Sequence, residues 1–122
     1  MTKFKIIATW VVIVLLAAAV GAAGTGKLMG VEMLHQSFAN MGLPSWFGYF
    51  IGACEIAGAV GLLVRKWSAL AALGLTLIML GAIGYHLAFD PIGMAVPAVV
   101  LAVLASVTFV SRKRDSILVA IH

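Results

Sequence analysis

Four side chains capable of acid–base chemistry stand within, or at the ends of, strongly apolar sequence: Lys27, Glu55, His86 and Asp90. Glu55 lies near the middle of residues 46–64, which are otherwise almost wholly apolar. A carboxylate at the centre of a membrane helix costs at least about 2.5 kcal/mol to insert, and such residues are usually functional. Desolvation disfavours the charged form, so we expect an unpaired Glu55 to be neutral.

Glu55 and His86 are therefore the candidate catalytic residues. A neutral acid at the midplane, with a histidine and an aspartate nearer the surface, suits proton relay or hydrogen bonding to a carbonyl-bearing lipophile such as a quinone. The alternative interpretation is structural, with Glu55 bonded to a neighbouring helix and serving only to hold the helices together.

The elements on either side of residues 64–67 set the depth of these groups. So short a turn makes the flanking helices antiparallel neighbours. Counting outward from it at about 1.5 Å per residue places Thr76 at the depth of Glu55, and His86 about 10 Å further out. We therefore predict Thr76 as the hydrogen-bond partner of Glu55, and we do not expect a direct bond between Glu55 and His86.

Lys27 and Asp90 allow two interpretations each. Lys27 is expected to extend to the membrane interface; the alternative is a cation turned inward towards a buried carboxylate or an anionic ligand. Asp90, followed by Pro91, is typical of an N-cap, and it also shares a helix face with His86. The predicted ligand-binding residues are Lys27, Glu55, Thr76, His86 and Asp90.

The composition defines the class of protein. Of 122 residues, 64% are hydrophobic and 10% are charged, whereas soluble domains are typically about 45–50% apolar and about 25% charged. Apolar stretches at about 6–27, 45–64, 67–89 and 91–110 are each near the length of a spanning helix. We predict an all-α fold, an integral membrane four-helix bundle forming a single domain over residues 1–122.

The basic residues predict the topology. Seven of the eight fall on one side of a four-span arrangement, and Lys27 alone falls on the other. By the positive-inside rule both termini are cytoplasmic, with a basic tail at 111–122. The start of the chain has features of a secretory signal, but its removal would place the C-terminal basic cluster outside. This pattern also argues against a nucleic-acid partner.

Metal and disulfide chemistry have little support in the sequence. The single cysteine, Cys54, excludes a disulfide or a CxxC pair within the chain. A bis-histidine haem site needs two buried histidines, and His86 is the one histidine within a predicted span. No metal site and no intrinsic haem are expected.

Further features predict how the outer half is built. Apolar residues recur at helical spacing over 30–41, which predicts an amphipathic segment on the outer surface, ended by a left-handed cap at Gly42. Small residues at Gly48, Gly52, Gly58 and Ala59 predict that the Glu55 face packs on another helix. Pro97 is expected to kink the fourth span and to widen the outer half of the bundle.

The sequence resembles the DoxX-like family of bacterial and archaeal membrane proteins. The resemblance rests on Gly-Thr-Gly-Lys at 24–27, Gly-Leu-Pro at 42–44, Glu55 followed by Gly58, and the small four-span size. It implies a multi-pass inner-membrane protein that acts as a small or accessory subunit of a quinone-linked redox system, with Lys27 and Glu55 as its polar residues. A quinone is the candidate ligand, and whether the chain is itself an enzyme stays open.

Two other functions remain as alternatives. One is a small proton-coupled transporter that works as a dimer and uses Glu55. The other is a structural or assembly subunit whose glycine surfaces bind partner helices. The expected partners are the lipid bilayer, a lipophilic small molecule, and either a second copy of the chain or a membrane or soluble partner subunit.

Overall fold

The computed structural model describes residues 2–89 and 92–113, and these residues are helical with short connections. The helices are α1 (Lys3–Leu28), α2 (Glu32–Asn40), α3 (Phe47–Leu63), α4 (Arg65–Phe89), the short 3-10 helix η1 (Ile92–Ala95) and α5 (Val96–Arg112). The all-α prediction is confirmed for this part of the chain. The predicted N-cap at Asp90 and the tail after Lys113 lie outside the described residues.

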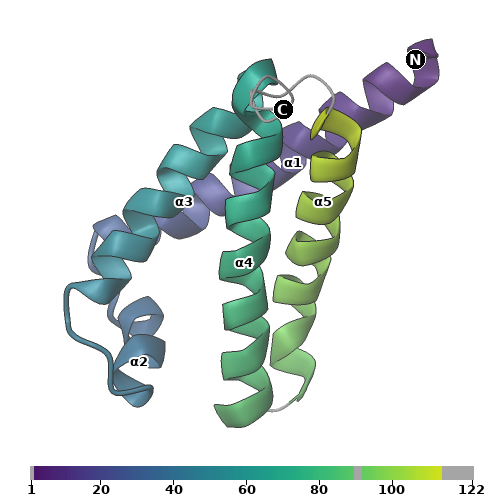
Figure 1. Ribbon diagram of the computed structural model, residues 1–122. Helices are drawn as coiled ribbons and strands as arrows, with labels where there is room; N and C mark the ends of the chain where they lie inside the picture. The colour runs from purple at the N-terminus through teal and green to yellow at the C-terminus, as the bar shows by residue number, and fades with distance from the viewer. Residues whose placement is uncertain (1, 90–91, 114–122) are drawn as a thin grey trace.

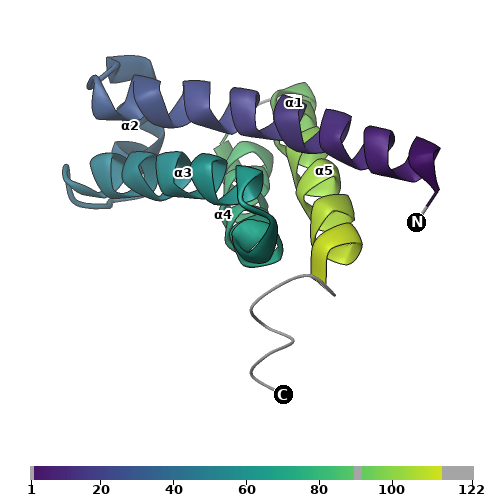
Figure 2. The same cartoon turned by 90° about the horizontal axis from the view of Figure 1, so that it is seen from above.

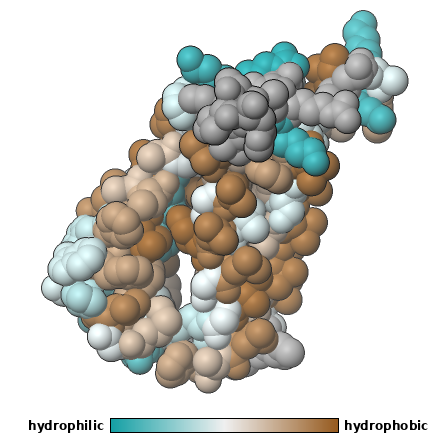
Figure 3. Space-filling view, in the orientation of Figure 1, coloured by the Kyte–Doolittle hydropathy of each residue, from teal (hydrophilic) through white to brown (hydrophobic). Residues whose placement is uncertain are grey.

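The helices differ in length but share an apolar outer surface. α1 and α4 are long and apolar enough to cross a membrane, and α3 and α5 are shorter apolar helices. Large apolar side chains such as Leu15, Leu77, Leu80 and Val110 are more than half exposed. Figure 3 shows hydrophobic residues over much of the visible face. Soluble monomers rarely expose so much contiguous apolar surface.

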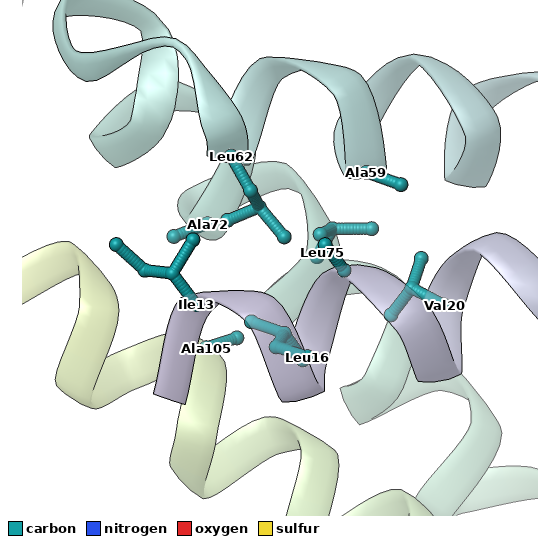
Figure 4. Close-up of a cluster of buried hydrophobic side chains, with 9 residues drawn as sticks. Ile13, Leu16, Val20, Ala59, Leu62, Ala72, Leu75 and Ala105 are labelled. Carbon is teal, nitrogen blue, oxygen red and sulfur yellow. The ribbon is translucent and has the colours of Figure 1, made fainter. Parts of the chain in front are cut away.

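The helices pack as two pairs (Figures 1 and 2). α1 lies along α3, and α4 lies along α5, while α3 and α4 join the pairs on either side of Val64. Apolar side chains from all four helices meet where the pairs join, among them Ile13, Leu16, Leu62 and Leu75 (Figure 4). This core holds the four helices together in the half of the molecule that contains the α3–α4 junction.

Away from this core, α3 and α4 diverge towards the ends near α2 (Figure 1). The kink predicted at Pro97 is wrong, because α5 begins at Val96 and Pro97 lies in its first turn. A proline there replaces an N–H group that has no partner within the helix. The open half of the molecule therefore comes from the divergence of α3 and α4 and not from a bent α5.

Two glycines in the left-handed conformation bound α2. Gly30 and Gly42 both have φ of 75°. After α2, Leu43 N–H donates to Phe38 O and Gly42 N–H donates to Ala39 O, a Schellman cap, which confirms the cap predicted at Gly42. Gly30 forms the same cap at the end of α1, where its N–H donates to Lys27 O. These two reversals direct α2 back beside α1 and α3.

Candidate functional site

Two glycines bring α1 and α3 into close contact. A Cβ added at Gly24 would lie 2.8 Å from Gly52 O and 3.0 Å from Glu55 Cβ. A Cβ added at Gly52 would lie 2.8 Å from Lys27 Cβ and 3.0 Å from Gly24 O. Lys27 and Glu55 each follow the crossing glycine of their own helix by three residues, which is close to one turn. The glycine contact therefore sets the two charged residues against each other.

Lys27 and Glu55 form a buried ion pair. Lys27 Nζ lies 2.8 Å from Glu55 Oε1, and their side chains are 14% and 2% exposed. Oε1 is buried, and its contact with the ammonium lacks the alignment of a hydrogen bond. Of the two interpretations of Lys27, the structure has the inward one. The expectation of an unpaired, neutral Glu55 does not apply to this arrangement.

The Thr76 hydroxyl donates to Ala72 O at 2.8 Å, within its own helix. The predicted Thr76–Glu55 bond is therefore not the arrangement found. Counting residues from the turn gives the depth of Thr76 and Glu55 along their helices, but it does not give the face of α3 from which Glu55 projects. In the structure that face, which includes Gly48, Gly52 and Ala59, is buried, and its contacts at Gly52 are with α1. The prediction that small residues on this face receive another helix is thus confirmed at Gly52, where that helix is α1. At Gly58 the near neighbour is Leu75 of α4.

The ion pair stands in the wall of a cavity of about 590 Å³ between the diverging helices. Its walls come from α1, α2, α3, α4 and α5, and most of its lining is apolar, including Phe38, Ile51 and Leu101. The polar side chains that reach it are those of Lys27, Ser37, Glu55, Tyr85 and His86. The space-filling view shows a hollow between α3 and α4 (Figure 3). An apolar cavity with a few convergent polar groups is the usual form of a small-molecule site.

Of His86 and Asp90, the structure describes only His86. His86 lines the cavity from α4, as Glu55 does from α3. Asp90 lies outside the described residues. Of the five predicted ligand-binding residues, Lys27, Glu55 and His86 thus border one cavity.

α2 closes one side of the cavity and is held at its first turns by His35. His35 Nε2 lies 2.7 Å from Lys27 O. A carbonyl oxygen can only accept, so Nε2 carries the hydrogen. The ring also packs on Tyr49 of α3, with centroids 4.5 Å apart. His35 is not among the residues predicted from the sequence, and the available signal was its position in the first turn of α2, five residues after Gly30.

We expect His35→Ala to loosen α2 without disturbing the core. The loss of one hydrogen bond and of the ring contact should lower the local stability of α2 by about 1 kcal/mol. A change of about 1 kcal/mol corresponds to about a fivefold change in an equilibrium constant. Hydrogen exchange of the amides of Glu32–Asn40 should therefore become about fivefold faster, while exchange of the α1 and α3 amides is unchanged.

A substitution at Gly48 should disturb the same contact of His35 with α3. A Cβ at Gly48 would overlap the His35 imidazole, so Gly48→Ala should accelerate exchange in α2 as His35→Ala does. Met33→Ala, at a position 80% exposed on α2, serves as the control. Unchanged exchange in both His35→Ala and Gly48→Ala would contradict this role for His35.

The far end of α2 is joined to α4 by a polar contact that was not predicted from the sequence. Asn40 Nδ2 donates to Tyr85 Oη at 2.9 Å, and Asn40 Oδ1 accepts from Gln36 Nε2 at 3.0 Å. The Gln36–Asn40 spacing of four residues is typical of a helix-surface pair, but its extension to Tyr85 depends on the tertiary fold. α2 is thus attached to α1 and α3 at one end and to α4 at the other.

The structure defines a class of protein: a helical bundle with an apolar outer surface and a buried ion pair in the wall of an apolar cavity. The family model described as the DoxX-like family matches residues 11–107, from α1 into α5, and the chain belongs to this family. The resemblance noted from residues 24–27 and Glu55 is confirmed. The family is membrane-associated. No curated protein and no solved structure matches the chain.

Proposed function

We propose that the chain is a four-span protein of a bacterial or archaeal inner membrane, with both termini cytoplasmic. The exposed apolar side chains on α1, α3, α4 and α5 support lipid contact on all four helices. The basic start of α1, the α3–α4 junction and the basic end of α5 lie towards one end of the molecule (Figure 1). Grouped basic ends are the pattern of the positive-inside rule.

We further propose that the cavity binds a lipophilic molecule with a carbonyl or similar acceptor oxygen, a quinone being the leading candidate. The observation that carries this proposal is the buried Lys27–Glu55 pair in the wall of an otherwise apolar cavity. The cavity volume, about 590 Å³, is within the range of small-molecule sites. The apolar walls suit a ring and tail, and the pair supplies a polar contact for an oxygen.

In this proposal the chain acts as an accessory subunit of a quinone-linked redox system. The Lys27 ammonium is a donor to a carbonyl oxygen, and the Glu55 carboxylate is a group that can take up or release a proton beside it. Reduction of a quinone to the hydroquinone consumes two electrons and two protons. A partner subunit supplies the electrons, and the residues around the cavity bind the ring and exchange protons.

Binding of a benzoquinone with a decyl tail to the protein in lipid nanodiscs tests this function. Glu55→Gln removes the charge of Glu55 and the ion pair while keeping nearly the same volume. We expect its affinity for the quinone to fall about tenfold, because Lys27, the donor to the quinone oxygen, loses the carboxylate that positions it, and a hydrogen bond to a charged group contributes about 1.5–3 kcal/mol. Quenching of tryptophan fluorescence by the quinone measures the affinity.

Thr76→Val is the matched control, because Thr76 has the depth first predicted for the site but bonds within α4. We expect it to bind the quinone as the wild type does. Equal affinity of the wild type and Glu55→Gln, in variants that fold and insert normally, would contradict the proposed site.

A further inference from the structure

Tyr85 holds the one aromatic hydroxyl among the residues that line the cavity. It lies on α4 at the end facing α2, and its ring stacks on Phe89 with centroids 5.0 Å apart. Its oxygen accepts a hydrogen bond from Asn40 Nδ2. A phenol has one hydrogen to donate and an oxygen that accepts. With the Asn40 amide donating to this oxygen, the Tyr85 hydrogen is left for another acceptor.

The direction of this contact is coupled to that of a second hydrogen bond. Asn40 Oδ1 accepts from Gln36 Nε2, so the amide nitrogen of Asn40 is the end that faces Tyr85. In this series of hydrogen bonds Gln36 donates to Asn40 and Asn40 donates to Tyr85, which lines the cavity. The other hydroxyl in the lining, that of Ser37, donates to Leu34 O within α2.

We infer that the Tyr85 hydroxyl donates a hydrogen bond to the ligand at the α2 end of the cavity, and that Gln36 and Asn40 are positioning residues that keep this donor available. The inference rests on the proposed ligand-binding function of the cavity. It adds a second polar contact to that of Lys27. The preferred ligand is then an apolar molecule with acceptor oxygens, such as a dicarbonyl, and not a plain hydrocarbon chain.

The same three residues have one other self-consistent arrangement. If both amides turn over, Asn40 Nδ2 donates to the Gln36 oxygen and the Tyr85 hydroxyl donates to Asn40 Oδ1. In that arrangement the Tyr85 hydrogen is consumed and the ligand loses its donor. A ligand with an acceptor oxygen stabilises the first arrangement. The identity of residue 36 therefore controls how readily Tyr85 donates to the ligand.

Tyr85→Phe tests the donor directly. The probes are decylbenzoquinone and, as a competitor without oxygens, decylbenzene. We expect Tyr85→Phe to bind the quinone about fivefold more weakly, as loss of one neutral hydrogen bond implies, and to bind decylbenzene as the wild type does. A merely loosened α2 would instead weaken both probes by similar factors.

Substitutions at Gln36 test the positioning role, since Gln36 is exposed on α2. Gln36→Glu can only accept from Asn40 when ionised, which selects the arrangement without the free donor, and should weaken quinone binding about fivefold. Gln36→Lys can only donate to Asn40, which selects the arrangement with the donor, and should bind the quinone at least as well as the wild type. Ala39→Glu and Ala39→Lys, at an exposed position of the same helix, control for charge.

The outcomes separate this inference from the function on which it rests. If the wild type does not bind the quinone, the proposed function and the inference are both wrong. If the wild type binds but Tyr85→Phe binds equally well, this inference alone is wrong. It is also wrong if Gln36→Glu and Gln36→Lys shift the quinone affinity in the same direction.

Discussion

Lys27→Met should lower the free energy of unfolding by about 3–5 kcal/mol, the usual range for removing one partner of a buried ion pair. Glu55 is the more deeply buried partner, with its side chain 2% exposed. Loss of the ammonium therefore leaves a carboxyl group that must either stay charged without a partner or take up a proton. Reversible unfolding in mixed detergent micelles measures the change.

The double substitution Lys27→Met/Glu55→Gln should recover most of this loss. It leaves no uncompensated charge, and replacement of a whole buried ion pair is often close to neutral. Lys66→Met is the control, because Lys66 is an exposed cation at the α3–α4 junction, and surface substitutions usually change stability by less than about 0.5 kcal/mol. A double variant as unstable as the sum of its two single variants would contradict a coupled pair.

Gly52→Ala should be the second severe substitution. The added Cβ would lie 2.8 Å from Lys27 Cβ and 3.0 Å from Gly24 O. The second of these is a backbone atom, so a change of rotamer cannot relieve the contact and α1 and α3 must separate. Overpacking of this kind costs about 1–3 kcal/mol. Separation of the helices also lengthens the Lys27–Glu55 contact, so quinone affinity should fall together with stability.

Gly74→Ala is the matched control on α4. A Cβ at Gly74 meets no atom within 4 Å, and alanine in a helix is more stable than glycine by about 0.5–1 kcal/mol. We expect this variant to be as stable as the wild type or slightly more stable, with unchanged quinone affinity. If Gly52→Ala and Gly74→Ala behaved alike, close contact of α1 and α3 would not be what positions the pair.

The helices and the burial of Glu55 could be predicted from the sequence. Apolar stretches and turn residues predicted helical segments close to those observed, because hydropathy and glycine conformation are local properties. Glu55 was selected from its place in apolar sequence, which needs no knowledge of its neighbours. The small residues around it correctly predicted that this face receives another helix.

The partner of Glu55 could not be derived in the same way. Connectivity makes α3 and α4 neighbours, and this favoured Thr76, but a helix has several faces and connectivity does not say which one carries the contact. The equal spacing from Gly24 to Lys27 and from Gly52 to Glu55 was visible in the sequence. Its meaning appears only when the two glycines are found opposite each other. Tyr85 was missed because its partner Asn40 lies on α2, which does not adjoin α4 in sequence. The partners of His35 lie on the adjoining helices α1 and α3, but these contacts depend on how the turn at Gly30 directs α2 back beside both helices.

Residue 27 contacts two parts of the molecule through two different groups. Its ammonium pairs with Glu55, whereas its carbonyl oxygen accepts from His35 and from the N–H of Gly30. Any amino acid supplies that carbonyl, so natural or engineered variation of the side chain can change the chemistry of the cavity while α2 stays anchored. Binding preference and closure of the cavity can therefore evolve separately, even though both depend on one position.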